Sequence, residues 1–110
     1  RGICSVQNVI EADGSVYPCD FYALDEYCLG NVRTDDFFYL QSNPITERFV
    51  SDSAESMESC RNCHYYGICR GGCRRNRIAL ADREWKNYFC RAYRMFYEYS
   101  LERFLRLAGK

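Results

Sequence analysis

Four cysteines fall within one short run of the sequence, "CRNCHYYGICRGGC", at spacings that suit a metal centre. Two residues separate Cys60 from Cys63, so both sulfur atoms can face one centre. Cys69 and Cys73 follow closely in the sequence. Zinc accepts four such ligands, and an iron-sulfur cluster also takes cysteines but needs room for a larger inorganic core. Disulfides between such near neighbours would be strained or would close very small loops, which disfavours a secreted disulfide scaffold. The run therefore predicts a metal or cluster site.

The residues around this run favour an iron-sulfur cluster over zinc. Gly67, Gly71 and Gly72 free the backbone to approach closely and to direct N–H groups at sulfur. A cluster with four thiolates carries about two negative charges when oxidised. Seven arginines lie near the expected ligands in the sequence, namely Arg61, Arg70, Arg74, Arg75, Arg77, Arg91 and Arg94. A solvated basic face is the equally weighted alternative for them, and His64 is expected beside the ligands or in solvent.

The other four cysteines lie outside the run. The stretch "CSVQNVIEADGSVYPC" alternates β-branched residues around "ADG", which predicts a β-hairpin with Cys4 and Cys19 at its open end. Cys90 lies near the expected start of a long helix, where unpaired N–H groups favour a thiolate, and so becomes an expected ligand. Cys28 is expected to be a free thiol, with a ligand role as the alternative.

Two helix signals fall between these cysteines, in residues 34–50. Thr34 is the expected N-cap of the first, with acidic residues in its first turn. Asn43 is the expected N-cap of the second, before Pro44. The polar residues 51–59 are expected to form a loop or a weak helix.

The last part of the chain, from about residue 87 to 108, predicts one long amphipathic helix that ends before Gly109. Its apolar stripe has spacings of three or four: Phe89, Tyr93, Phe96, Ser100, Phe104 and Leu107. The fold class expected from all these signals is α+β, with a small N-terminal β-hairpin, cysteine-rich cluster-binding loops, short helices and one long C-terminal helix.

Length and composition bound the remaining possibilities. With 110 residues the chain is expected to be a single domain, 1–110, too small to be comfortably stable without a covalent or metal staple. Fifteen basic residues balance fifteen acidic ones, so no bulk charge argues for nucleic acid or an anionic membrane as partner. Charges interrupt every apolar stretch, which excludes a transmembrane helix. The start at Arg1 without methionine suggests a piece of a longer protein.

The full cysteine pattern resembles a known family. Cys4-x9-Gly14-x4-Cys19, then the run of four, then Cys90 is similar to the SPASM domain. This domain is the C-terminal extension of a class of radical S-adenosylmethionine enzymes and carries two auxiliary [4Fe-4S] clusters. More narrowly, "DGSVYPCDFYALDEYCLGN" and "NYFCRAYRMFYEY" resemble the anaerobic sulfatase-maturating enzymes, which oxidise a cysteine or serine of a sulfatase to formylglycine.

The resemblance implies how the thiols are divided between the two clusters. The second auxiliary cluster would be held by Cys60, Cys63, Cys69 and Cys90. Cys73 would instead join Cys4 and Cys19 on the first cluster. In the maturases the first cluster has a fourth cysteine upstream of the position of Cys4, so this site is expected to lack one ligand here.

Asp20, in "PCDFY", matches the maturase residue proposed as general base. Hydrogen-atom abstraction leaves a carbon radical that becomes an aldehyde only after losing a proton and an electron, and a carboxylate beside a cluster can accept the proton. A cap at the hairpin exit is the alternative role for Asp20. Tyr17, Phe21 and Tyr22 could line a substrate channel, although packing is the commoner fate of such residues.

The resemblance also implies what this chain does not do alone. The Cys-x3-Cys-x2-Cys motif of the S-adenosylmethionine-cleaving cluster occurs nowhere in the sequence, so that cofactor would be bound by a separate barrel domain of the same enzyme. No turnover is expected from this chain by itself. The expected partners are that barrel and a sulfatase peptide in the cytoplasm, without nucleic acid or membrane. The alternatives are a SPASM domain of another peptide-modifying maturase and a structural zinc module that binds a protein partner.

Overall fold

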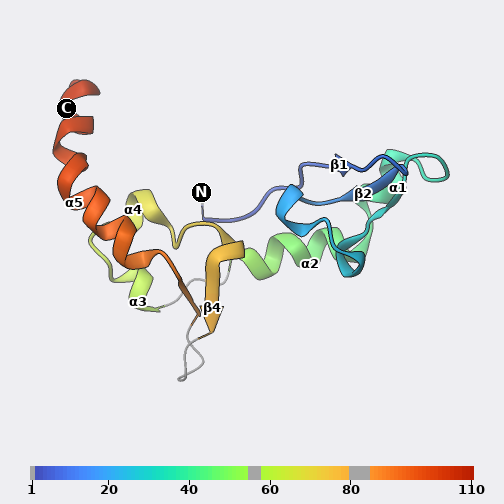
Figure 1. Cartoon of the computed structure of the whole chain (residues 1–110), viewed down its shortest axis with the longest axis horizontal. Coiled ribbons are helices and arrows are strands. Elements are labelled where there is room, and N and C mark those ends of the chain that lie inside the picture. Colours follow the sequence, from blue (N-terminus) through green and yellow to red (C-terminus); the bar gives the residue numbers. More distant parts are fainter. Residues whose placement is uncertain (1, 55–57, 80–84) are drawn as a thin grey trace. The chain divides into compact units, whose positions relative to one another are not determined.

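The computed structural model describes residues 2–54, 58–79 and 85–110, and the chain divides into two compact units (Figure 1). Unit 1 covers residues 3–55, and unit 2 covers residues 56–110 together with Gly2. The small sheets, short helices and long C-terminal helix confirm the α+β class. The assignment of residues 1–110 to a single domain stays a prediction.

The balanced charge of the sequence divides unequally between these two parts of the chain. Residues 1–55 contain three basic and ten acidic residues, a formal charge of −7, whereas residues 56–110 contain twelve basic and five acidic residues, a formal charge of +7. The net charge of zero is therefore the sum of two oppositely charged halves of the sequence.

The sheet of unit 1 is antiparallel, with strand order β1-β2-β3. It consists of β1 (Val9–Ile10), β2 (Ser15–Tyr17) and β3 (Gly30–Asn31). β1 and β2 form the hairpin predicted from the sequence. The turn requires glycine at position 14, because its φ is +89° and a Cβ atom there would lie 2.6 Å from Asn31 Oδ1. The Asp13 carboxylate closes the turn by accepting the Ser15 N–H at 2.9 Å.

The first helix of unit 1, α1 (Phe37–Gln41), begins two residues later than the sequence suggested. Its N-cap is Asp36, whose carboxylate accepts the Tyr39 N–H at 2.8 Å, so the prediction of Thr34 as N-cap was wrong. The Thr34 hydroxyl donates to Asn31 O at 3.4 Å, and Asp35 accepts the Asn31 N–H at 2.8 Å. These two residues therefore build the turn after β3 instead of the helix.

The second helix, α2 (Pro44–Ser53), starts as predicted. Asn43 is its N-cap and accepts the Ile45 N–H at 2.8 Å, with Pro44 at the first helical position. α2 covers the first part of the segment expected to be a loop or weak helix. Residues 55–57 of that segment lie outside the described ranges, and α3 (Glu58–Arg61) follows them.

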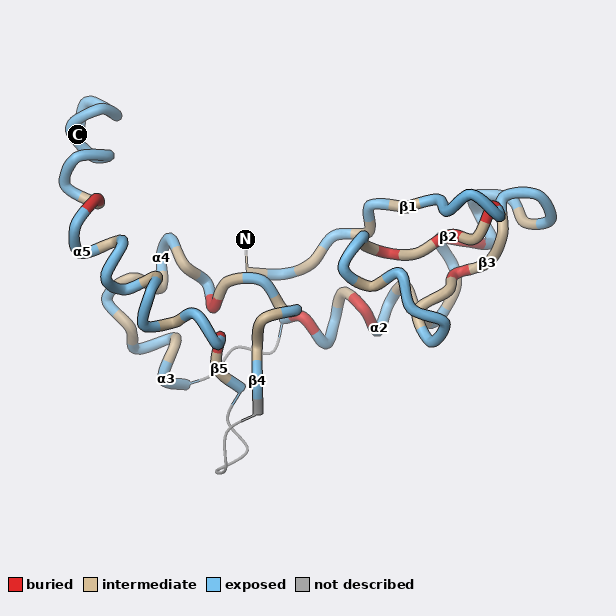
Figure 2. Tube along the Cα trace, in the orientation of Figure 1, coloured by how far each residue is buried: buried red, intermediate tan, exposed pale blue. Residues whose placement is uncertain are grey.

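The core of unit 1 lies between the sheet and the two helices. Val16, Leu29 and Leu40 are each at most 1% exposed and pack together. Figure 2 marks the buried residues in red along the backbone. Phe49 of α2 is also buried and meets the Tyr22 ring edge to face at 5.2 Å. The 3-10 turns η1 (Asp20–Tyr22) and η2 (Asp25–Tyr27) each end in a tyrosine of this aromatic group.

Unit 2 places short elements around the start of a long helix. Its elements after α3 are α4 (Tyr66–Cys69), η3 (Arg74–Asn76), β4 (Arg77–Ala79), β5 (Trp85–Asn87) and α5 (Cys90–Leu107). β4 and β5 pair antiparallel. The predicted long helix is confirmed, but it begins at Cys90 because Asn87 is the last residue of β5 and pairs with Arg77.

The helix α5 ends where the sequence predicted, but much of its predicted apolar stripe is exposed. Gly109 has φ +71° and Lys110 N donates to Leu105 O at 2.9 Å, so the predicted glycine stop is confirmed. Ser100 is buried, but Phe96 and Phe104 are each 53% exposed within the described chain. Among the described helices, none has both the length and the apolar character that crossing a bilayer requires.

Candidate iron-sulfur cluster sites

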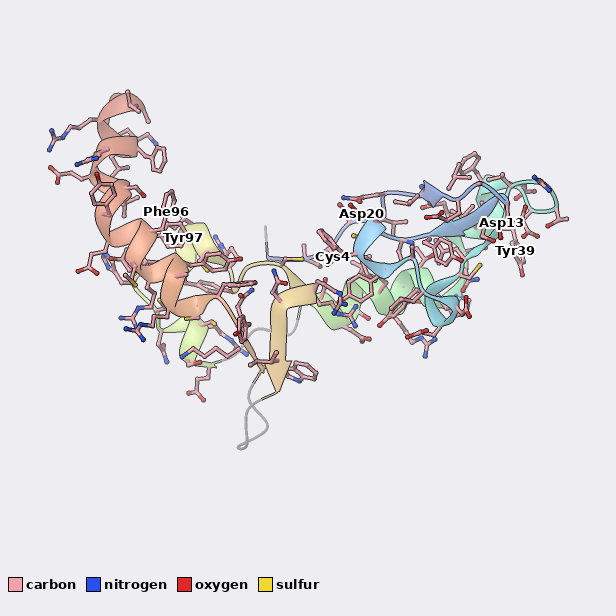
Figure 3. The ribbon with its side chains drawn as sticks, viewed as in Figure 1. Cys4, Asp13, Asp20, Tyr39, Phe96 and Tyr97 are labelled. Carbon is pink, nitrogen blue, oxygen red and sulfur yellow. The ribbon has the colours of Figure 1, made fainter. Side chains whose placement is uncertain are left out.

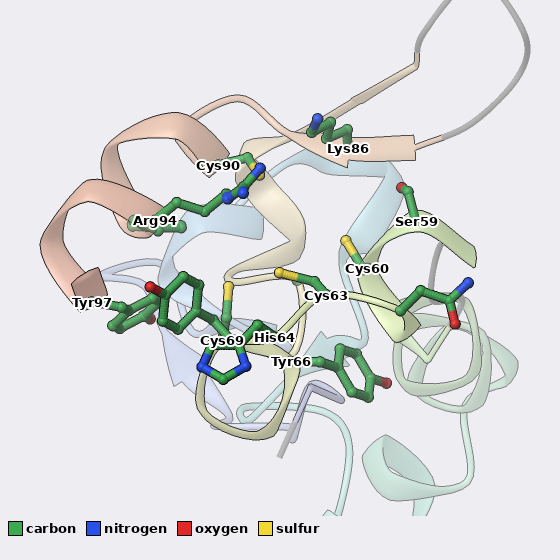
Figure 4. Close-up of a pocket in the computed structure, with 14 residues that line it drawn as sticks. Ser59, Cys60, Cys63, His64, Tyr66, Cys69, Lys86, Cys90, Arg94 and Tyr97 are labelled. Carbon is green, nitrogen blue, oxygen red and sulfur yellow. The ribbon is translucent and has the colours of Figure 1, made fainter. Parts of the chain in front are cut away.

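Four thiols surround one cavity of about 350 Å³ in unit 2 (Figure 4). Cys60 comes from α3, Cys69 ends α4 and Cys90 begins α5, while Cys63 lies in the turn between α3 and α4. Backbone hydrogen bonds shape that turn, because Cys63 N donates to Cys60 O at 3.0 Å and Tyr66 N donates to Cys63 O at 2.9 Å. The four cysteines expected to share a cluster therefore lie around one space, and their role as ligands stays a prediction.

The chemistry of this cavity suits a thiolate-ligated cluster, whose net charge is negative. Among the described residues that line it there is no carboxylate, and the cationic side chains are Lys86 and Arg94. Partial burial raises the pKa of the Cys60 thiol, and the neighbouring Cys90, Cys69 and Cys63 raise it further, against the opposite influence of Arg77. Thiolates gathered here repel one another, and an iron-sulfide core would relieve that repulsion as protons are released.

All eight cysteines lie within the described ranges, and each has a free thiol. Within those ranges no three His, Cys, Asp or Glu side chains are close enough together to hold a single metal ion. The four thiols of unit 2 instead lie around the cavity of about 350 Å³, farther apart than the ligands of one metal ion.

The chain between Cys69 and Cys73 takes an uncommon course. Arg70, Gly71 and Gly72 have φ values of +52°, +82° and +63°, so three consecutive residues are left-handed. The Arg70 guanidinium lies 5.0 Å from the centre of the Tyr66 ring and its Nε donates to Gly67 O, which supports the strained position. After this turn Cys73 is exposed and is not among the residues that line the cavity.

Asn87 connects this left-handed segment to the start of α5. Its amide is 4% exposed and donates to Gly71 O at 3.1 Å and to Cys73 O at 3.3 Å. Its Oδ1 atom accepts the Phe89 N–H at 2.9 Å, directly before Cys90. Asn87 thereby holds the loop that follows one expected ligand against the helix that begins with another. An asparagine just before a helix start is a signal for the local bond to the Phe89 N–H, but not for the bonds to Gly71 and Cys73, which were not predicted.

Replacing Asn87 by alanine is expected to loosen this connection. The change leaves the Gly71 carbonyl and the Phe89 N–H without their partner, while Cys73 O keeps the Asn76 N–H at 3.1 Å. Opening of the first turn of α5 should therefore become easier by about 1–3 kcal/mol. Amide hydrogen exchange at residues 89–93 measures this. Asn62→Ala is the matched control, because Asn62 lines the same cavity but is exposed and should change exchange by less than about 0.5 kcal/mol. Unchanged protection in Asn87→Ala would contradict the role given to this side chain.

The arginines and the histidine near the cysteines take different positions. Arg94 lines the cavity, and Arg77 acts on Cys60 while donating to Gly72 O at 3.0 Å. His64 is exposed at the edge of the cavity, with its ring 5.0 Å from that of Tyr65. Of the seven arginines near the cysteines in sequence, Arg94 and Arg77 are therefore placed to influence the thiols. The basic charge of unit 2 extends beyond the cavity.

Tyr97 is a further cavity residue that the cysteine spacing did not indicate. Partial burial raises the pKa of the Tyr97 hydroxyl, and the nearby Cys69 thiol raises it further. Figure 4 places Tyr97 on α5 beside Cys69 at one wall of the cavity.

Cys4 and Cys19 belong to unit 1 and lie close enough to interact electrostatically. Partial burial raises the pKa of the Cys19 thiol, and the nearby Asp20 and Cys4 also raise it. Cys4 N donates to Ser53 Oγ at 2.7 Å, which ties it to the end of α2. The prediction that the hairpin brings these two cysteines near each other is therefore confirmed. Cys73 belongs to unit 2, so its grouping with them stays a prediction.

Asp20 begins the turn η1, directly after Cys19 (Figure 3). Its Oδ1 atom accepts the Phe21 N–H at 3.0 Å and the Cys19 thiol at 3.2 Å. In the described part of the chain its Oδ2 atom has no hydrogen-bond partner, and the residue is exposed. The carboxylate is thus held at one oxygen, and its other oxygen can meet a substrate.

The other residues singled out in unit 1 show less direct signs of function. The Cys28 thiol is half-buried and donates to Gly30 O at 3.5 Å, as a free structural thiol would. Tyr22 packs in the aromatic group with Phe49, which agrees with the expectation that such residues more often pack than line a substrate channel. Phe21 is 60% exposed beside Asp20 and remains available for contact with a substrate.

A protein-family comparison identifies the class to which this arrangement belongs. Residues 4–64 match the SPASM model, described as an iron-sulfur cluster-binding domain. The match covers more than half of the chain, and it includes the hairpin and the first two cysteines of the run. The chain belongs to the SPASM family of iron-sulfur cluster-binding domains.

Individual relatives narrow the comparison. The chain is 40% identical over 110 residues to a cysteine-type anaerobic sulfatase-maturating enzyme of Clostridium perfringens, covering 99% of this chain and 30% of the relative. It is 29% identical over 99 residues to a serine-type anaerobic sulfatase-maturating enzyme of Bacteroides thetaiotaomicron, covering 87% of this chain and 24% of the relative. The chain thus spans about a third or less of the curated relatives it matches.

A solved structure has the same fold. It is native anSMEcpe with bound AdoMet and Kp18Cys peptide, which superposes with a TM-score of 0.88 at 39% identity. The superposition covers 98% of this chain and 30% of that one. The fold described above is therefore also that of a segment of this longer solved chain.

Proposed function

We propose that this chain is the auxiliary-cluster domain of a radical S-adenosylmethionine enzyme that oxidises a cysteine of a sulfatase to formylglycine. The observation that carries the proposal is the 40% identity to a cysteine-type maturating enzyme over 99% of the chain. The lower identity of 29% to a serine-type enzyme favours cysteine over serine as the residue oxidised. The retained "PCDFY" sequence around the exposed Asp20 supports the same reaction.

The ligands are proposed to form two sets. Cys60, Cys63, Cys69 and Cys90 would hold the second auxiliary [4Fe-4S] cluster. Cys4, Cys19 and Cys73 would hold the first, together with one ligand from outside this chain. When bound, these groups would supply one-electron oxidation. Because thiolate ligands need a reducing compartment, we place the enzyme in the cytoplasm.

Asp20 would accept the proton of the substrate thiol. The substrate carbon loses a hydrogen atom, and the resulting radical loses one proton and one electron to give a thioaldehyde, which is at the oxidation level of an aldehyde. Water then replaces the sulfur, which leaves as hydrogen sulfide. The Phe21 N–H and the short turn η1 hold Oδ1 in place, which leaves Oδ2 for the substrate. The barrel domain of the same enzyme would bind S-adenosylmethionine.

The test is product analysis with the full-length enzyme. Incubated anaerobically with reductant and S-adenosylmethionine, it should convert the target cysteine of a sulfatase-derived peptide to formylglycine, detected by mass spectrometry. The rate should be about tenfold or more higher than with the corresponding serine peptide. A peptide with alanine at the target position is the control. A thioether product, or no product from either peptide, would count against sulfatase maturation and favour another peptide-modifying maturase. Stoichiometric zinc without iron would exclude both.

A further inference from the structure

We infer that a basic groove of unit 2, formed by Lys86, Arg91 and Arg94, is the docking site of a small acidic one-electron carrier protein, which takes the electron from the second auxiliary cluster. The inference rests on the function and the ligand set proposed above. It adds the partner that returns the cluster to its oxidised form after each turnover.

The groove lies directly beside the cavity of the four thiols. Its volume is about 270 Å³, and the residues that line it are Lys86, Cys90, Arg91, Arg94, Met95 and Glu98. Lys86, Cys90 and Arg94 line the cavity as well, and Figure 4 shows these three side chains at one wall of it. Because Cys90 lines both hollows, an electron on a cluster bound through Cys90 would be within one residue of a protein seated on the groove.

Positive charge dominates the groove. Arg91 and Arg94 are three residues apart on α5, so they lie on the same face of the helix, and Lys86 comes from β5. The groove has one carboxylate, that of Glu98, against these three cations. In the described part of the chain no ion pair neutralises any of the three cations, and the two arginines are exposed. The groove can therefore attract an acidic partner and speed its encounter with unit 2.

The size and composition of the groove suit a transient contact between two proteins. Met95 is 62% exposed and adds an apolar contact to the three cations, and both methionine and arginine are enriched in protein interfaces. Electron-transfer partners typically meet over small interfaces, below about 1,200 Å² in total, in which complementary charge orients the two proteins. Such a contact lets the carrier leave once the electron has passed.

The proposed reaction requires an acceptor of this kind. Each oxidised substrate leaves one electron on the auxiliary clusters, and a cluster can accept the next electron only after it has lost the first. In the proposed step the reduced cluster loses one electron and the carrier gains it. When the carrier holds a flavin, a proton from water accompanies the electron, and no covalent bond forms between the two proteins. A nucleic acid would also be attracted to the cations, but the presence of Cys90 in the groove favours an electron carrier.

Arg91→Glu is the variant that tests the groove by itself. Arg91 is exposed and lines the groove but is not among the residues that line the cavity, so the four thiols keep their surroundings. Arg103→Glu is the matched control, because it makes the same change of charge at another exposed position of α5. It lies about 18 Å further along the helix, which exceeds the Debye length of about 8 Å at physiological salt.

The experiment is a stopped-flow reaction of the full-length enzyme in which the S-adenosylmethionine-cleaving cluster has been removed by mutation of its own cysteines. The auxiliary clusters are reduced, excess reductant is removed, and the enzyme is mixed anaerobically with oxidised flavodoxin, an acidic flavin carrier. The absorbance of the one-electron-reduced flavin reports the transfer. At about 0.05 M salt, Arg91→Glu should lower the second-order rate constant about tenfold, whereas Arg103→Glu should stay within about twofold of the unmodified enzyme. Raising the salt to about 0.5 M should remove most of this difference. Iron content should be equal in all three proteins.

The outcomes separate this inference from the proposed ligand set. An unchanged rate in Arg91→Glu, or an equal loss in Arg103→Glu, overturns the groove as the docking site and leaves the ligand set intact. Loaded and reduced clusters that give no reduced flavin with any of the three proteins overturn the electron carrier. Binding of a single-stranded oligonucleotide that Arg91→Glu abolishes, without any reaction with flavodoxin, would assign the groove to a nucleic acid. A Cys60→Ala protein that keeps both its iron and its rate overturns the ligand set itself.

Discussion

Asp20→Asn in the full-length enzyme is expected to reduce formylglycine formation by about 10²–10⁴-fold, because the substrate thiol loses its proton acceptor. Asparagine keeps the size of the side chain and can still accept the Phe21 N–H through its carbonyl oxygen. Reductive cleavage of S-adenosylmethionine should continue, since the barrel performs it. The measurement is parallel quantification of 5′-deoxyadenosine and formylglycine peptide.

Asp25→Asn is the matched control for this variant. Asp25 is exposed and begins the next 3-10 turn, η2, just as Asp20 begins η1. It follows no proposed ligand, so its replacement should leave the aldehyde yield within about twofold of the unmodified enzyme. Retained formylglycine yield in Asp20→Asn, or an equal loss in Asp25→Asn, would rule out the specific role of Asp20.

The second large effect is expected at the cavity of unit 2. Cys60→Ala in the full-length enzyme should lose about four iron atoms and the matching sulfide, because a cubane cluster needs its four cysteines. Since ligand binding supplies folding energy, the residues from 60 to 90 should also lose amide-exchange protection. Iron and sulfide analysis, followed by hydrogen exchange read by mass spectrometry, tests both parts.

Cys28→Ala distinguishes loss of a ligand from loss of any thiol. Cys28 is half-buried like Cys60, but its sulfur donates to Gly30 O and belongs to neither ligand set. Its replacement should leave iron content unchanged. Iron loss from Cys28→Ala would add it to the ligands of the first site, and full iron content in Cys60→Ala would remove Cys60 from the second.

Local signals in the sequence were sufficient for much of the fold. The hairpin followed from β-branched alternation around a glycine turn, and α2 followed from Asn43 before Pro44, because both depend on neighbouring residues. The N-cap of α1 was misplaced because Thr34 and Asp36 are both good caps. The choice between them depends on contacts with Asn31, which a local pattern does not contain.

In the candidate site, too, the residues predicted from the sequence were those with a local signal, and the residues missed were those with distant partners. Cysteine spacing and family resemblance indicated the four thiols that line the cavity. Asn87 and Tyr97 were missed because their partners lie at Gly71, Cys73 and Cys69, far away in the sequence. Neither residue type signals such contacts by itself, so only the folded chain reveals them.

The left-handed residues 70–72 limit how this sequence can diverge. A Cβ atom at position 72 would meet Asn87 Nδ2 at 2.6 Å and the Tyr93 ring at 2.9 Å, so no larger residue fits there without displacement. An insertion or deletion between Cys69 and Cys73 would rotate one sulfur relative to the other, whereas exposed loop tips generally absorb such length changes. Descendants of this protein that still use both cysteines should therefore keep the interval between them at three residues, even where the surrounding loops vary in length.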